Sequence, residues 1–402
     1  MKEEVREVIV EKKVGFSTTE VIIVVFITLI FGAFLGSFFA FKKNNVKRQT
    51  LGGEFDEFIT TYNNITNNYY EKVDSEKLIN SAIKGMIEYL DDPYTVYMDN
   101  EESEAFNEVV GGEYYGIGAV ISKVEDKIII SAIIKNSPAE KAGLKTKDEI
   151  LSIDDKEIKN MNPSDVTNLI KNQKTMDVSI KVRRESEEKT IKVLKGIIDI
   201  PSVSSKVFDK NNKKIGYVAL SIFASNTYDQ FKEELEKIEK ESIDALIIDV
   251  RSNPGGHLKE VSKILSTFIT KEKVLYQIKS KGVATKVYSS NTDNKDYKIA
   301  VIVNENSASA SEILAASLRE SRDALVVGKN TYGKGTVQKA YSLKSGATIK
   351  YTSEEWLTPL GNSINKKGLK PDIEVDLDKK YFDDPKDDND TQLQKALDEI
   401  TK

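Results

Sequence analysis

Between residues 200 and 375, short apolar runs with strand character alternate with amphipathic runs of helical period. Regular alternation of this kind is typical of a parallel sheet covered by helices, because each pair of parallel strands needs a crossover connection. The pattern predicts strands at 215–220, 245–250, 299–303 and 324–327, and helices at 228–239, 260–269 and 311–322. We therefore expect an α/β core here, in a chain of 402 residues that is long enough for two or three domains.

Residues 106–190 have a different character, with short runs of β-branched residues and few helical periods. Strands are predicted near 119–121, 128–130, 149–153 and 178–182. One short helix begins after Ser137, a cap residue followed by Pro138 at the first helical position, and it ends at Gly143. A second helix is predicted at 163–171. The chain is thus expected to carry a separate β-rich domain before the core.

Residues 50–105 are predicted to be helical, because apolar side chains recur at steps of three and four. The second of two helices begins after Asp74 and stops at Asp91-Asp92-Pro93. The acidic tail 376–402 ends in a short helix with Leu393, Ala396, Leu397 and Ile400 on one face. These apolar faces need a partner, and we predict that residues 50–105 and the C-terminal helix form a homodimer.

An uncharged stretch from Val21 to Phe41 follows the polar segment 1–20. Its length of 21 residues spans about 30 Å as a helix, which is the hydrocarbon thickness of a bilayer. Bulky residues occupy the place where a signal peptidase needs small ones, so a retained single transmembrane helix is predicted. Basic residues flank the stretch on both sides, and the positive-inside rule leaves the orientation open.

Composition and charge exclude several kinds of partner and site. The net charge is −5 and no long basic run exists, which argues against nucleic acid as a partner. The absence of cysteine excludes disulfides and thiolate metal sites. His257 is the only histidine, and with no second ligand near it in the sequence it is expected to be structural, or at most a wall of a site. No metal and no organic cofactor is predicted.

Ser309 lies between a predicted strand and a predicted helix, within Ser307-Ala308-Ser309-Ala310-Ser311. A serine there is exposed at a strand end, beside a helix N-terminus whose free N–H groups favour an oxyanion. The Ala310 amide is a natural donor to such an oxyanion. Taken alone, these serines could equally be helix caps. With only one histidine in the chain, a serine nucleophile would need a lysine base, which must be kept neutral.

Lys334 is the candidate base, and Gln338 could orient its amine. The pKa of that lysine would have to fall from about 10.4 to about 7–8, and only burial can lower it so far. The run Asp249–Gly256 follows another buried strand, and its paired glycines Gly255 and Gly256 could direct a second amide at the same oxyanion. An ordinary turn is the alternative for that run.

Two motifs are rejected on context. Residues 328–334 nearly match a phosphate-binding loop, but Gly335 stands where a Ser or Thr is needed, and a strand follows instead of a helix. Ser186-Glu187-Glu188-Lys189 matches the Ser-x-x-Lys pattern of penicillin-binding proteins, but it lies in a charged turn between two predicted strands.

Taken together, these segments resemble the carboxyl-terminal processing proteases, serine–lysine endopeptidases with an internal PDZ domain. The resemblance rests on Asn304–Leu314, Val326–Gln338, Asp249–Gly256, Thr358–Asp372 and Leu90–Tyr97, in that family's order. It implies an α+β multidomain protein with a ClpP/crotonase-like α/β core and an inserted PDZ domain. It also implies that Ser309 is the nucleophile, Lys334 the general base and Gln338 its orienting partner, with oxyanion amides at Ala310 and at Gly255 or Gly256.

The resemblance extends to residues 106–190. Tyr115-Gly116-Ile117-Gly118 is similar to the loop whose amides bind a peptide carboxylate in PDZ domains, and Ser137–Leu144 is similar to the helix that follows. In some relatives a basic residue near 169–174 couples peptide binding to activation, and Lys171 is the nearest candidate. That stretch departs from the family, because it lacks the usual glycine-rich turn.

The resulting expectation is a serine endopeptidase anchored in a bacterial cell membrane, with its catalytic body outside the cytoplasm. It would cleave proteins whose apolar C-terminal tails bind to its PDZ domain. Two alternatives stay open from the sequence. One is a catalytically silent, membrane-anchored PDZ scaffold, and the other is a Ser–Lys hydrolase or amidase that acts on small substrates.

Overall fold

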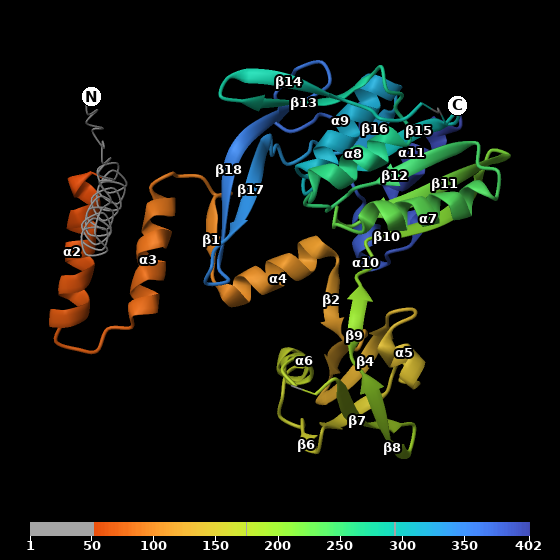
Figure 1. Ribbon diagram of the computed structural model, residues 1–402. Coiled ribbons are helices and arrows are strands. Elements are labelled where there is room, and N and C mark those ends of the chain that lie inside the picture. Colours follow the sequence, from red (N-terminus) through yellow and green to blue (C-terminus); the bar gives the residue numbers. More distant parts are fainter. Residues whose placement is uncertain (1–51, 174, 293–294) are drawn as a thin grey trace, which may run out of the picture. The chain divides into compact units, whose positions relative to one another are not determined.

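The computed structural model describes residues 52–173, 175–292 and 295–402 (Figure 1). The chain divides into two compact units, with the boundary between Ile83 and Lys84. The predicted transmembrane segment 21–41 lies outside the described residues. Within the described ranges, every helix falls short of the length and apolarity that crossing a bilayer requires.

The first unit contains α2 (Gly53–Asn68) and the beginning of α3 (Ser75–Glu88). Asp74 caps α3 as predicted, because its Oδ1 accepts the N–H groups of Glu76 and Lys77 at 3.1 Å each. Neither helix has a single buried residue. Their large apolar side chains, Phe55, Phe58, Ile59, Ile65 and Met86, are exposed.

In the second unit, a six-stranded sheet forms the α/β core. Its strand order is β10 (Val203–Lys210), β11 (Lys213–Leu220), β12 (Ala245–Asp249), β15 (Lys298–Val303), β16 (Leu325–Gly328) and β19 (Ile373–Glu374). Only the β10–β11 pair is antiparallel. The predicted parallel α/β core is therefore confirmed, with strand and helix bounds within a few residues of those expected.

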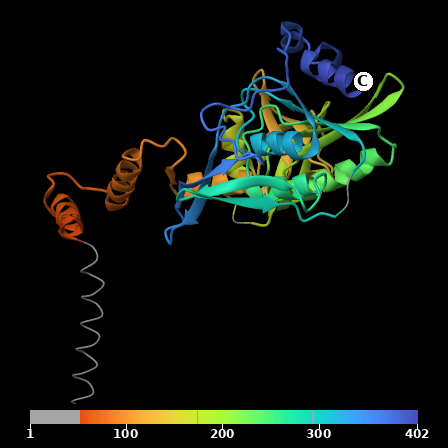
Figure 2. The same cartoon turned by 90° about the horizontal axis from the view of Figure 1, so that it is seen from above.

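The two faces of this sheet are covered by different helices. α7 (Thr227–Glu239), α8 (Leu258–Ser266) and α9 (Ala310–Arg322) enclose the larger apolar cluster with alternate strand residues such as Ile248 and Val301. α11 (Thr391–Ile400) covers the other face, where it packs on Ile247 and Ile302 (Figures 1 and 2). The alternation of side chains along each strand directs neighbouring residues to opposite faces.

The expectation that the C-terminal helix offers its apolar face to a second subunit is wrong. Leu393, Ala396, Leu397 and Ile400 are buried against the chain's own sheet. A central parallel sheet must be covered on both sides, and α7–α9 cover only one. Periodicity reveals that a helix has an apolar face but not which surface that face contacts.

A second sheet lies beside the core and consists of β1 (Val96–Met98), β13 (Val274–Ser280), β14 (Val283–Tyr288), β17 (Thr336–Ser342) and β18 (Thr348–Leu357). The long strand β18 pairs with β1, β13 and β17. Of this sheet, the sequence predicted only the β17 run. The pairing of β1 brings the segment that precedes α4 (Asn100–Gly111) next to β18, the strand that also pairs with β17.

The β-rich domain is inserted between β1 and β10. Its sheet contains β3 (Ala119–Val124), β4 (Lys127–Ile133), β5 (Glu149–Ile153), β6 (Lys156–Glu157), β7 (Asp177–Arg184) and β8 (Glu187–Leu194). α5 (Pro138–Ala142) and α6 (Pro163–Lys171) pack with it around an apolar cluster of their own. The Ser137 cap and the left-handed Gly143 at the end of α5 are as predicted. A two-stranded ladder, β2 (Glu113–Gly116) with β9 (Gly196–Asp199), leads into and out of the domain.

Candidate active site

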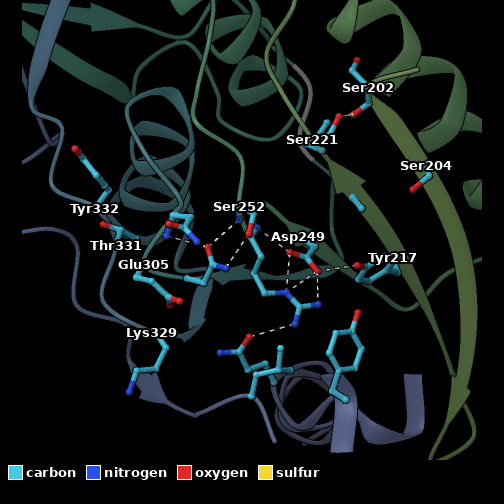
Figure 3. Close-up of a pocket in the computed structure, with 18 of the residues that line it drawn as sticks. Ser202, Ser204, Tyr217, Ser221, Asp249, Ser252, Glu305, Lys329, Thr331 and Tyr332 are labelled. Atoms are coloured by element: carbon cyan, nitrogen blue, oxygen red, sulfur yellow. Dashed lines mark hydrogen bonds and ion pairs between the residues drawn. The ribbon is translucent and has the colours of Figure 1, made fainter. Parts of the chain in front are cut away.

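Three segments with candidate residues meet at one edge of the core sheet. The turn 250–256 follows β12, the segment 304–309 follows β15, and the loop 329–335 follows β16. Because these strands are parallel and adjacent, their carboxyl ends lie together. A cleft of about 1260 Å³ opens at this edge, and Figure 3 shows Asp249, Ser252, Glu305 and Tyr332 among its walls. Ser309, Lys334 and Gln338 are not among the residues that line it, so the cleft borders the candidate site and does not contain it.

Ser309 occupies a strained position immediately before α9. Its φ and ψ angles are 55° and −113°, outside the regions that a non-glycine residue adopts easily. Such a conformation costs on the order of 1–3 kcal/mol, so the surroundings must hold it in place. Ser307 Oγ donates to the Val250 carbonyl at 2.7 Å, and Ser311 Oγ donates to the Asn253 carbonyl at 2.9 Å. Two of the three clustered serines thus bind the neighbouring turn and hold the segment that carries Ser309.

The turn 253–256 packs directly against Ser309. Gly255 and Gly256 have φ angles of 102° and 140°. A Cβ on Gly255 would lie 2.9 Å from the Cβ of Ser309, and a Cβ on Gly256 would lie 2.2 Å from the Phe223 carbonyl oxygen. Both positions therefore need glycine. The Gly255 N–H donates a hydrogen bond to Asn253 Oδ1 at 2.9 Å, and the Gly255 amide therefore already has a partner.

A buried carboxylate, Glu312, joins the segments that carry Ser309 and Lys334. Its Oε2 accepts the backbone N–H of Ser309 at 2.8 Å and that of Lys334 at 2.9 Å. Its Oε1 accepts the Gly333 N–H at 2.7 Å and the Thr331 hydroxyl. The side chain is 0% exposed, and burial raises the pKa of this carboxyl against the opposing effect of its hydrogen bonds. The sequence analysis missed Glu312, although an acidic residue directly before the apolar run Ile313–Ala316 was an available indication.

Lys334 lies in the loop between β16 and β17 with its side chain half-buried. Its carbonyl accepts the Trp356 indole N–H at 2.9 Å. Burial lowers the pKa of its ammonium group and nearby Lys350 lowers it further, while Asp92 and Glu312 act in the opposite direction. An inward-facing lysine with a lowered pKa is what a lysine base requires.

Within the described chain, no hydrogen bond joins Ser309 Oγ to Lys334 Nζ. The side chain of Gln338 makes no hydrogen bond to Lys334 Nζ either. Its Nε2 donates to Thr336 Oγ1 at 2.9 Å and to Thr352 Oγ1 at 3.2 Å, across the β17–β18 pair. The backbones of Ser309 and Lys334 are therefore held together, while their side chains are not joined by a hydrogen bond in the described residues.

An ion-pair cluster fastens the turn 250–256 to the C-terminal helix. Arg251 Nη2 lies 2.6 Å from Asp249 Oδ2 and 2.7 Å from Asp390 Oδ2, just before α11. The Tyr217 hydroxyl donates to Asp249 at 2.7 Å, and burial raises the pKa of that phenol (Figure 3). The cluster gives α11 a second role besides covering the sheet.

His257 has a structural position, as expected. Its Nε2 lies 3.0 Å from Ser225 Oγ and 3.1 Å from the Val110 carbonyl oxygen, so the ring connects α4 to the core. Among the described residues, no group of three or more His, Asp and Glu side chains could hold a metal ion.

The β-rich domain has a groove between β3 and α6. Its volume is about 210 Å³, and it is lined by Glu108, Tyr114, Gly116, Ile117, Ala119, Ile121, Thr167, Ile170 and Lys171. Lys171 Nζ pairs with Glu108 Oε2 of α4 at 2.7 Å and lies 5.7 Å from the centre of the Tyr114 ring. The groove is mainly apolar, with one ion pair among its walls.

The predicted peptide-binding residues are only partly brought together. Gly116, Ile117 and Lys171 line the groove, whereas Tyr115 and Gly118 are not among its walls. Tyr115 is exposed and its ring lies 5.9 Å from Lys195 Nζ. Tyr114 lines the groove instead, because successive strand residues point their side chains to opposite sides.

Three family models match the chain. The model described as peptidase family S41 matches residues 214–375, the N-terminal domain of activating protease CtpB matches 38–102, and a PDZ domain matches 116–194. The β-rich insertion is thus a PDZ domain, as expected.

Known proteins agree with these matches. The carboxy-terminal processing protease CtpB of Bacillus subtilis is 40% identical over 323 residues, which are 80% of this chain and 67% of that protein. CtpA of the same organism is 36% identical over 330 residues, covering 82% and 70%. A crystal structure described as an S41 protease from Bacteroides fragilis superposes with a TM-score of 0.50 at 15% identity, covering 83% and 91%, and it supports the fold alone.

Proposed function

Because this chain belongs to the carboxy-terminal processing serine proteases of peptidase family S41, we propose that Ser309 is its nucleophile and Lys334 its general base. The observation that carries the proposal is the shared carboxylate of Glu312. One oxygen atom accepts the backbone N–H of both residues, so the two segments are held beside each other. The lowered pKa of Lys334 supplies the second requirement, an amine that can be neutral near physiological pH.

In the proposed reaction, Ser309 Oγ attacks the carbonyl carbon of the scissile bond while Lys334 Nζ takes the hydroxyl proton. The developing oxyanion lies at the N-terminus of α9, where the Ala310 N–H is a donor. Gly256 is the preferred second donor, since the Gly255 amide is bound to Asn253. The Lys334 ammonium then protonates the leaving amine, and water releases the acyl group by the reverse sequence.

We further propose that the described arrangement is a resting one. Ser309 Oγ and Lys334 Nζ must approach each other, and Gln338 must exchange a threonine partner for the amine if it is to orient the base. Glu312 would keep the two backbones beside each other while these side chains move.

For substrate recognition, we propose that the groove between β3 and α6 binds an apolar C-terminal tail as an added strand. Lys171 would then exchange the carboxylate of Glu108 for that of the peptide. The apolar walls and the half-exposed ion pair support this proposal. Protein tails, not small amides, are the substrates that such a groove favours.

Anchoring and assembly are also proposals. Residues 21–41 would form a single membrane helix, with the catalytic body outside the cytoplasm. The exposed aromatic and aliphatic side chains of α2 and α3 would form the homodimer interface, without the C-terminal helix. Sedimentation of residues 43–402 at a monomeric mass would contradict the dimer.

The function is tested by mass spectrometry of an unfolded protein with an apolar C-terminus, incubated with the full chain in detergent or with its Ser309→Ala variant. We expect fragments only with the unaltered chain, and their ends would identify the cleavage preference. If neither protein produces fragments while both bind the tail, the result favours a scaffold or a protease that needs an activating partner. Fragments from both would place the nucleophile elsewhere.

A further inference from the structure

The segment Asp92–Thr95 has no role in the proposed reaction, yet it is fastened beside the base. Asp92 Oδ1 accepts the Tyr94 N–H at 3.1 Å, and Asp92 Oδ2 accepts the Thr95 hydroxyl at 2.6 Å. Thr95 Oγ1 in turn accepts the Thr352 N–H at 3.1 Å. The turn is thus bound to β18, the strand whose Thr352 hydroxyl also holds Gln338.

This turn places the ring of Tyr94 over the amine of Lys334. The distance from Nζ to the ring centre is 4.7 Å, inside the range of about 6 Å over which a cation is attracted to an aromatic face. Within the described chain, Lys334 Nζ makes no hydrogen bond or ion pair. Burial raises the pKa of the Tyr94 phenol to about 12, with Tyr332 adding to the effect, so the ring stays uncharged at working pH.

We propose that Tyr94 belongs to the catalytic machinery, and that its ring face stabilises the ammonium group that Lys334 becomes when it takes the Ser309 proton. The inference rests on the proposed Ser–Lys function. The proton moves from Ser309 Oγ to Lys334 Nζ and later to the leaving amine. The ring interacts strongly with the charged amine and weakly with the neutral one. It therefore favours the transition state over the ground state, and such a difference accelerates the chemical step.

The charged groups around Lys334 explain why an aromatic ring, and not a carboxylate, lies beside its amine. Asp92, Glu312, Lys350 and Tyr332 are the ionisable groups near Lys334 and Tyr94. A carboxylate in direct contact with Nζ would keep the lysine protonated and unable to act as a base. An aromatic face attracts the cation more weakly, so burial can still keep the resting amine neutral while the ring stabilises the charge that forms later.

The test replaces Tyr94 in the full chain by Phe and then by mono-, di- and trifluorinated phenylalanines, which withdraw electron density from the ring with little change in shape. Cleavage of a fluorogenic peptide is followed for kcat, KM and pH dependence. We expect Tyr94→Phe to stay within about threefold of the unaltered chain, and kcat to fall stepwise to about tenfold lower with three fluorines, at constant KM.

The acidic limb of the profile should move to lower pH across the series, because a weaker attraction for the ammonium lowers the pKa of Lys334. A role in packing alone would leave that limb in place. A matched series at Tyr341, an exposed residue of β17, should change nothing. A flat series at Tyr94 would overturn the proposal, and a rising series would make the ring a brake instead of a catalytic group.

The Ser309→Ala and Lys334→Ala variants in the same assay separate this inference from the function beneath it. If Lys334→Ala keeps its activity, the Ser–Lys mechanism fails and the inference about Tyr94 fails with it. If Lys334→Ala is inactive while the fluorinated series is flat, only the role of Tyr94 is lost.

Discussion

The catalytic segments and the PDZ groove are held in opposite ways. Ser309 and Lys334 are joined through Glu312, which is fully buried and accepts four hydrogen bonds. The groove is joined to α4 by one ion pair, Lys171–Glu108, whose side chains are 33% and 36% exposed. Losing a partner from a buried charged network costs several kcal/mol, whereas an exposed ion pair contributes about 0–1 kcal/mol. The proposed reaction centre is therefore held more firmly than the proposed recognition site, whose ion pair can exchange partners at little cost.

The largest effect is expected at Lys334, and it tests whether the segments joined by Glu312 carry the catalytic residues. Lys334→Arg should lower kcat by at least about 10³-fold, because a guanidinium does not lose its proton near neutral pH and cannot act as a base. The measurement is hydrolysis of a fluorogenic peptide. Lys339→Arg, at an exposed position on the following strand, is the control and should be unaffected. Turnover by Lys334→Arg at the level of the unaltered chain would remove lysine from the mechanism.

Glu312→Gln tests whether the shared carboxylate positions the two segments. The amide cannot accept all four donors, and we expect kcat to fall about 100-fold and stability by about 2–4 kcal/mol. The matched control is Glu260→Gln, which is also buried but accepts the Tyr228 N–H at 3.1 Å and pairs with Lys263, not with Ser309 or Lys334. That variant should lose stability but keep kcat, as measured by chemical denaturation and peptide hydrolysis. Equal loss of kcat in both variants would mean that Glu312 contributes stability alone.

The PDZ groove is tested by changing its ion pair, Lys171–Glu108. Glu108→Gln frees Lys171, and we expect the affinity for a peptide with an apolar C-terminus to rise about threefold, consistent with less than about 1 kcal/mol for such a pair. Lys171→Ala should weaken the same binding, as measured by fluorescence anisotropy. Glu104→Gln, one turn earlier on the exposed face of α4, serves as the control. A fall in affinity for Glu108→Gln would show that the ion pair supports the groove and does not compete with the peptide.

The smallest expected effect concerns the stability that the folded protein loses by burying the amine of Lys334. The folded state lowers the pKa of Lys334, so it binds fewer protons than the unfolded chain, and its stability falls as pH drops below the ordinary lysine value of 10.5. Lys334→Met removes this cost and should raise Tm by about 2 °C at pH 7. The gain should shrink as pH rises toward 10.5, and a gain that is independent of pH would point to packing instead.

The particular residues show what could be predicted and what could not. Ser309, Lys334 and the turn with Gly255 and Gly256 were placed at strand ends by local patterns, and the structure brings these strand ends together. Glu312 was missed because its four donors come from residues 309, 331, 333 and 334, and no local pattern predicts that such segments converge on one side chain.

The sequence by itself determined the helices and most of the strands of the core and of the PDZ domain, two helix caps, and the strand ends that carry the candidate residues. These features depend on local backbone preferences and on the period of apolar side chains. Only the tertiary structure decided that α11 covers the chain's own sheet, that Glu312 joins the two catalytic segments, and that Tyr94 lies over Lys334. Those contacts join residues distant in the chain, and they arise from the way in which whole layers pack.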